Sequence, residues 1–101
     1  MKKRRGFTML RIYREDESRA ITLRLEGTLA GDWVDVVEGC CRETLSEHGR
    51  RRIVVELDEV TTVDEKGEAL LRDLHESGIM LRGRGIHNQY LVERIQQAMA
   101  G

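Results

Sequence analysis

Proline is absent from this chain of 101 residues, and cysteine occurs only twice. No linker, low-complexity stretch or internal repeat divides the sequence, which favours one compact domain. The two cysteines, Cys40 and Cys41, are adjacent in sequence. Adjacent positions suit neither a loop-closing disulfide nor a CxxC metal or redox site. We therefore expect both to be small hydrophobic residues on a helix, in a reducing compartment.

An excess of charge of one sign is also missing, because 17 Lys and Arg stand against 18 Asp and Glu, for a net charge of -1. No global field favours nucleic acid or an anionic membrane, and we expect neither partner. Basic runs occur at residues 2–5 and 50–52. We expect the first to lie in a flexible tail, residues 1–7, and the second to contribute to a surface patch.

Long apolar runs are the third absence, since no window of the sequence approaches the length of a membrane span. A secretory signal requires an apolar segment after its basic amino terminus, and this sequence has no such segment. We expect a cytoplasmic protein without membrane insertion, although it could be a subunit of a membrane machine.

Hydrophobic spacing predicts alternating strands and helices along the chain. Residues 52–57 form a nearly continuous apolar run, typical of a central strand that is covered on both faces. Asp32 is the expected N-cap of the first helix, and Gly49 and Gly78 are the expected stops of the first two helices. The expected strands are 8–14, 20–25, 52–57 and 79–82, and the expected helices are 32–48, 65–77 and one around Tyr90, Leu91, Arg94, Ile95 and Ala98.

The order β-β-α-β-α-β-α predicts a single α/β domain over residues 1–101. We expect a mixed four- to five-stranded sheet with about three helices. Each of the two longer helices carries one apolar stripe, so both are expected to pack on one face of the sheet.

Patterns of catalytic or metal-binding residues are scarce. The histidines, His48, His75 and His87, have no HExxH spacing and no evident carboxylate or thiol companion. The segment 82–85, RGRG, follows an expected strand but lacks the ending of a phosphate-binding loop. We expect no enzymatic activity, no metal and no cofactor.

The segment TTVDEKGEALL, residues 61–71, departs from the local rules of helix formation. Lys66 faces the positive end of the helix dipole, and Gly67 is a poor helix former. Loops between a central strand and a helix are where α/β folds expose functional groups. Asp64 can cap the helix, and Gly67 can let a neighbouring strand or another chain approach. A purely structural role for both residues remains open.

Three segments, in this order, resemble the STAS domain of bacterial anti-sigma factor antagonists: ITLRLEGTLAGDW, RRIVVELDEVTTVDEKGEALL and GIMLRGRGIHNQYLVERI. The resemblance covers about residues 8 to 97. Residues 26–29, EGTL, are similar to the family's G-x-L turn before its first helix. Asp64 and Gly67 match the family's D-S-S-G-L segment, whereas Glu65 and Lys66 replace the two serines and Glu68 replaces the leucine.

The resemblance implies a protein-binding switch rather than a catalyst. Antagonists of this family bind a kinase-like anti-sigma factor, which inactivates them by phosphorylating the second serine. Lys66 stands at that position, cannot accept phosphate, and carries the opposite charge from phosphoserine. Thr61 and Thr62 lie nearby and are better explained as strand residues than as replacement phosphosites. The expected partner surface is Thr62, Asp64, Glu65, Lys66 and Gly67.

Other functions remain open. The same fold serves as the cytoplasmic STAS subunit on the ATPase of bacterial lipid-transport ABC complexes, and a short chain without the serines fits that role too. A small enzyme or a ligand- or nucleotide-binding STAS protein is the third alternative. Many antagonists also continue beyond their third helix, whereas this sequence stops at Gly101. That difference leaves a patch that a partner or a second copy, as in a homodimer, could cover.

Overall fold

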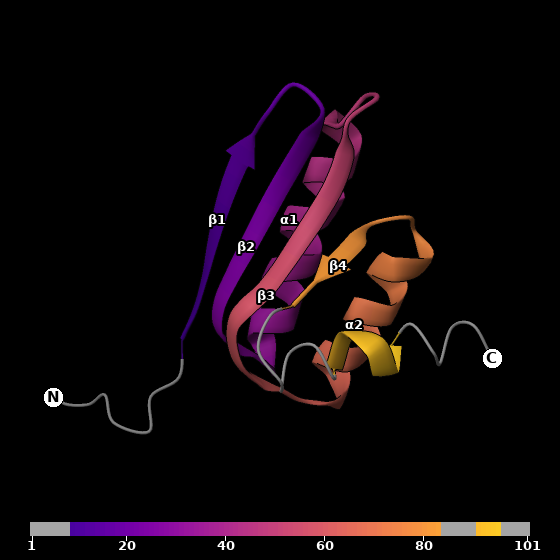
Figure 1. The fold of residues 1–101 in the computed structure, drawn as a ribbon. Coiled ribbons are helices and arrows are strands. Elements are labelled where there is room, and N and C mark those ends of the chain that lie inside the picture. The colour runs from indigo at the N-terminus through magenta and orange to yellow at the C-terminus, as the bar shows by residue number, and fades with distance from the viewer. Residues whose placement is uncertain (1–8, 84–90, 96–101) are drawn as a thin grey trace, which may run out of the picture.

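Four strands form one mixed sheet in the order β1-β2-β3-β4 (Figure 1). β1 (Leu10–Asp16) and β2 (Ala20–Leu29) are an antiparallel hairpin. β2 pairs in parallel with β3 (Arg52–Val63), which pairs in parallel with β4 (Met80–Arg82). The predicted fold class is confirmed, and residues 52–57 belong to a strand with neighbours on both sides.

Helices connect the parallel strands, as parallel pairing requires. α1 runs from Asp32 to Glu47 and α2 from Glu65 to Glu76. The computed structural model describes residues 9–83 and 91–95, and the last five are helical. Residues 1–7 and the rest of the predicted last helix lie outside the described residues. Gly49 and Gly78 follow the C-caps of α1 and α2, as predicted.

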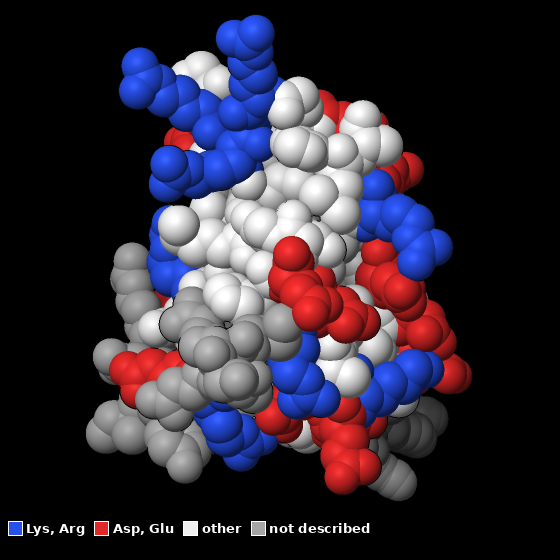
Figure 2. Space-filling model, turned by 90° about the vertical axis from the view of Figure 1, so that its right-hand side faces the viewer, with Lys and Arg blue, Asp and Glu red and all other residues white. Residues whose placement is uncertain are grey.

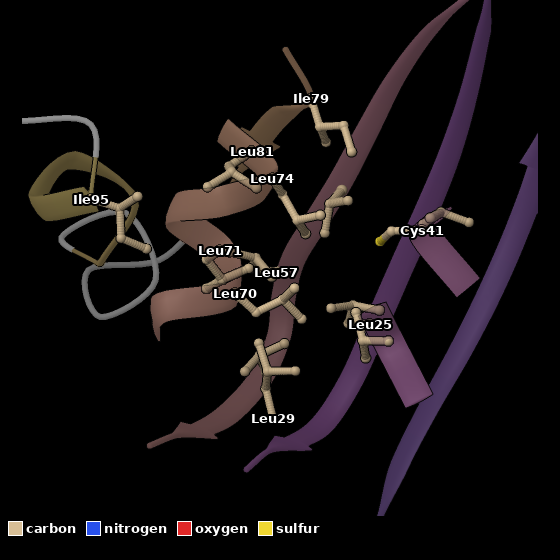
Figure 3. Packing of buried hydrophobic residues seen from close by; sticks show 14 of the residues in the cluster. Leu25, Leu29, Cys41, Leu57, Leu70, Leu71, Leu74, Ile79, Leu81 and Ile95 are labelled. Carbon is tan, nitrogen blue, oxygen red and sulfur yellow. The ribbon is translucent and has the colours of Figure 1, made fainter. Parts of the chain in front are cut away.

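The core lies between the helices and one face of the sheet (Figure 3). Alternation along a strand directs Leu23 and Leu25 of β2, and Val55 and Leu57 of β3, to this face, where each is at most 1% exposed. Burying each such side chain stabilises the fold by roughly 1.5–3 kcal/mol. Both helices contribute to the same cluster, as predicted: Val34, Val37 and Cys41 come from α1, and Leu70, Leu71 and Leu74 from α2.

α1, α2 and the helical residues 91–95 all contribute to the cluster on one face of the sheet. Coverage of residues 52–57 on the opposite face stays a prediction. Val54 points to this opposite face and is only 2% exposed. Its neighbours on the adjoining strands, Thr22 and Met80, flank it.

Both long strands continue beyond their predicted ends. β2 was expected to end before Gly27, and the register of β2 against β3 does shift there. Gly27 has a φ of 102°, and a Cβ at this position would lie 2.0 Å from the carbonyl oxygen of Met9. Glycine thus permits a bulge that lets the chain before β1 pass close by. β3 likewise continues from Leu57 to Val63.

The two cysteines occupy different environments on α1. Cys41 is buried, and this burial raises the pKa of its thiol to about 12. Burial also raises the pKa of Cys40, which is partly exposed. Because the thiolate is the reactive form, each raised pKa makes that thiol less nucleophilic.

We expect Cys41 in a Cys40→Ser variant to react with the thiol reagent DTNB roughly a thousandfold more slowly at pH 8 than a free cysteine does. The same variant should react fully in concentrated urea. Absorbance at 412 nm over time gives both rates. Rapid labelling of Cys41 in the folded protein would show that α1 does not bury its thiol.

Candidate functional site

The carboxyl ends of β2 and β3 lie side by side, because the two strands are parallel and Leu29 pairs with Val63. Each strand then leads into a helix. The amino termini of α1 and α2 are therefore neighbours at the end of the sheet where β2 and β3 terminate, visible at the lower end of Figure 1. The predicted partner residues lie at this end of the sheet.

Asp64 connects the two helix starts through its carboxylate. Its Oδ1 accepts a hydrogen bond from the backbone amide of Gly67 in α2 at 2.7 Å. Its Oδ2 accepts a hydrogen bond from the backbone amide of Gly31, the N-cap of α1, at 3.0 Å. We call this arrangement the Asp64 clasp. Hydrogen bonds from Gly31 and then Gly67 to the charged form lower the pKa of the Asp64 carboxyl.

The clasp explains how α1 begins without a capping side chain of its own. Asp32 was predicted to be the N-cap, and this prediction is wrong, because Asp32 is already the first helical residue. Gly31 is the N-cap and has no side chain to accept a hydrogen bond. The backbone amide of Gly31 instead donates a hydrogen bond to the carboxylate of Asp64, at the junction between β3 and α2. The predicted capping of α2 by Asp64 is confirmed.

Gly67 lies where α2 passes over the end of β2. A Cβ at this position would lie 2.3 Å from the carbonyl oxygen of Leu29 and 3.1 Å from Cγ1 of Val63. Atoms do not approach so closely without displacement. Gly67 is buried, and its lack of a side chain lets α2 lie close to the neighbouring strand β2.

Around the clasp, four exposed side chains form a surface that we call the helix-start rim: Asp35, Thr62, Glu65 and Lys66. The Nζ of Lys66 lies 3.1 Å from Oδ2 of Asp35, so an ion pair joins the first turns of α1 and α2. The two side chains are 52% and 61% exposed. Such an exposed pair adds about 1 kcal/mol at most, but it offsets the unfavourable position of a lysine at a helix amino terminus.

Glu68, which stands where the STAS segment has leucine, has a structural role. Its carboxylate forms ion pairs with Arg72, one turn later in α2, and with Arg94 in the helical residues 91–95. Only 20% of the Glu68 side chain is exposed. The start of α2 is thereby joined to the end of the described chain.

The structure thus divides the predicted site residues into two groups. Asp64 and Gly67 shape the junction, while Thr62, Glu65 and Lys66 point outward from it. Gly31 and Asp35 belong to the same site but were not predicted. Their proximity follows from the parallel pairing of β2 and β3, which the sequence near residue 31 does not encode. The described residues contain no group of His, Cys, Asp or Glu side chains that could hold a metal ion.

A second surface feature lies at the opposite end of the sheet. An open hollow of about 820 Å³ is bordered by the β1–β2 turn and by the loop before β3. Figure 2 shows Lys and Arg side chains gathered at the top of the molecule, above a largely uncharged area. The basic run 50–52 does contribute to a surface patch here, as expected; the arginines that line the hollow are Arg19, Arg50, Arg51, Arg52 and Arg82.

Acidic residues partly neutralise this hollow, since Glu15, Glu17 and Glu56 also line it. Arg82 is paired with Glu56 at 2.8 Å. Arg51 is paired with Asp16 at 3.1 Å and donates to the carbonyl oxygen of Glu47. Two of the five arginines therefore hold the turn, the helix end and the strand edge together.

No described helix of this chain is both long and apolar enough to cross a bilayer. A scan against models of protein families and a search of curated proteins give no match to the chain. Its similarity to the STAS domain consequently remains a prediction from the motifs and their order.

Proposed function

We propose that this chain is a regulatory protein-binding domain of the STAS type, similar to the anti-sigma factor antagonists. The partner binds the helix-start rim. The observation that carries this proposal is the Asp64 clasp, which holds the amino termini of two helices in fixed positions. Side chains on a rigid support lose less freedom when they bind a partner, which favours affinity.

The charges in the first turns of α1 and α2, within the rim and beside it, define the kind of partner surface that fits it. Asp32 and Asp35 lie in the first turn of α1, and Glu65 and Glu68 lie in the first turn of α2. Lys66 is the one cation that α1 and α2 contribute in these first turns. A complementary surface therefore presents mainly basic groups, with an acceptor for Lys66.

With lysine at position 66, phosphorylation at this residue cannot end the proposed interaction. In antagonists of the STAS family the corresponding serine is phosphorylated, and the phosphate ends binding. An ammonium group at that position accepts no phosphate and has the opposite charge. The interaction is then regulated by the amount of protein rather than by modification at residue 66.

The test begins with a pull-down from the native host to identify the partner. Binding of the purified partner is then measured by calorimetry for wild type, Lys66→Glu and Lys66→Ser. We expect Lys66→Glu to weaken binding about tenfold or more, because it places a further carboxylate beside those of Asp35, Glu65 and Glu68. Lys66→Ser should keep the fold, since exposed substitutions usually change stability by less than about 0.5 kcal/mol.

A matched control is Arg42→Glu, which reverses an exposed charge on α1 that pairs with Glu38 one turn away. It should leave partner affinity unchanged. Equal affinities for wild type and Lys66→Glu would move the interface away from the rim. A kinase-like partner that phosphorylates Lys66→Ser would support the antagonist role, whereas an ABC-transporter ATPase as the captured partner would favour the lipid-transport alternative.

A further inference from the structure

β1 is an edge strand whose outer side has no partner among the described residues. Backbone hydrogen bonds run from Thr28 to Met9 and from Glu17 to Ala20, so the odd-numbered residues direct their backbone groups toward β2. Those of Leu10, Ile12, Arg14 and Asp16 point outward, because the pattern alternates along an antiparallel strand. An unpaired edge of this kind is a template for another strand.

The side chains of β1 are complementary to a second copy of the same strand. In an antiparallel pair centred on Tyr13, Arg11 of each copy lies opposite Glu15 of the other, and the two Tyr13 rings meet at the centre. Opposite charges and aromatic pairs directly across strands both stabilise a sheet. In the described chain, Arg11 and Glu15 form no ion pair or side-chain hydrogen bond, so both are available.

Other registers fit less well. The outward backbone groups allow only pairings in which even-numbered residues meet even-numbered residues. Centring the pair on Arg14 places two arginines opposite each other, which is unfavourable. Centring it on Ile12 places Arg11 opposite Tyr13 and leaves Glu15 without an opposite charge. Only the pairing about Tyr13 matches both charges and uses the whole of β1.

Exposed apolar groups also gather near this edge. Tyr13 is 37% exposed and Met9, just before β1, is 45% exposed. Tyr13 is held beside Arg24 of β2, whose guanidinium lies 5.0 Å from the ring centroid. The ring is therefore positioned before any partner arrives.

From this complementarity we infer that the chain forms a two-fold symmetric homodimer through β1, joining two four-stranded sheets into one continuous sheet. Pairing edge to edge about a two-fold axis puts the same residues on both sides of the interface. The carboxyl ends of β2 and β3 then point in opposite directions in the two copies. Each helix-start rim remains accessible, at opposite ends of the dimer.

Charge exchange tests this arrangement. The molar mass of wild type, Arg11→Glu, Glu15→Arg and the double variant Arg11→Glu/Glu15→Arg is measured by sedimentation over a concentration series. We expect a concentration-dependent dimer for wild type. Each single variant should raise the dimer dissociation constant about tenfold, because symmetry places like charges together twice. The double variant restores opposite charges and should restore the dimer.

Arg42→Glu on α1 is the matched control and should dimerise like wild type. Circular dichroism and thermal unfolding of each variant establish that it is folded. A wild type that stays monomeric at every concentration would overturn the inference, and the charges of β1 would then serve to block pairing. A dimer that the single reversals leave unchanged, or that the double variant fails to restore, would overturn it too.

Discussion

Replacing Gly67 by alanine is expected to lower the free energy of unfolding by about 3 kcal/mol. The added Cβ would lie 2.3 Å from the carbonyl oxygen of Leu29, and this obstacle is backbone rather than a flexible side chain. α2 must therefore move away from β2. That movement lengthens the hydrogen bond from the Gly67 amide to Asp64, so the clasp weakens as well.

Gly39 provides a control of the same chemical change. It lies in α1, and a Cβ there would meet no atom within 4 Å. Because alanine favours helix more than glycine does, Gly39→Ala should raise the free energy of unfolding by about 0.5–1 kcal/mol. Urea unfolding followed by circular dichroism measures both variants. A Gly67→Ala protein as stable as wild type would mean that α2 does not pass so close to β2.

Removing the carboxylate of Asp64 is the second change with a large expected effect. Asp64→Ala leaves the amides of Gly31 and Gly67 without their acceptor, at the starts of two helices. Loss of a single N-cap is already destabilising, and here both helices are affected. We expect the melting temperature to fall by about 10 °C. Asp35→Ala, which removes an exposed carboxylate that caps no helix, should lower it much less.

The effect of Asp64 should also depend on pH. Backbone amides lower the pKa of its carboxyl in the folded state, so the folded chain binds this proton less readily than the unfolded chain does. The stabilisation is fully present above the unfolded pKa, near 4, and is lost as the pH falls through the lower folded pKa. The difference in stability between wild type and Asp64→Asn should be large at pH 7 and shrink below about pH 4. A difference that stays constant from pH 7 to pH 2 would contradict the assigned hydrogen bonds.

Much of the fold could be predicted from periodicity, because apolar alternation and helical spacing report local burial. The strand ends were less predictable. Asp58, Glu59, Thr61 and Thr62 interrupt the apolar run, yet β3 continues through them to Val63. Pairing with the second half of β2, beyond the bulge at Gly27, extends both strands. Polar residues in that part of β3 are tolerated because Glu59, Thr61 and Thr62 are exposed and Asp58 is only partly buried.

The candidate site could be predicted only where its contacts are local. Asp64 caps the amide three residues later, and the spacing of these two residues in the sequence indicated that bond. Its bond to Gly31 and the Lys66–Asp35 pair each join residues more than 30 positions apart. Such contacts depend on which strands become neighbours, and no local pattern contains that information. The prediction of Asp32 as a cap failed for this reason.

The parallel pairing of β2 and β3 also affects how the chain folds as it is synthesised. β1, β2 and α1 leave the ribosome first, and β1 can pair with β2 at once because only a short turn separates them. The other edge of β2 remains unpaired until Arg52–Val63, which follows the connecting helix α1, has emerged. During that interval the nascent chain exposes a strand edge from the middle of its future sheet, where chaperones or another nascent chain can bind. A slow stretch of translation that falls after β2 has emerged and before β3 has emerged prolongs that exposure, whereas a slow stretch after β3 has emerged does not.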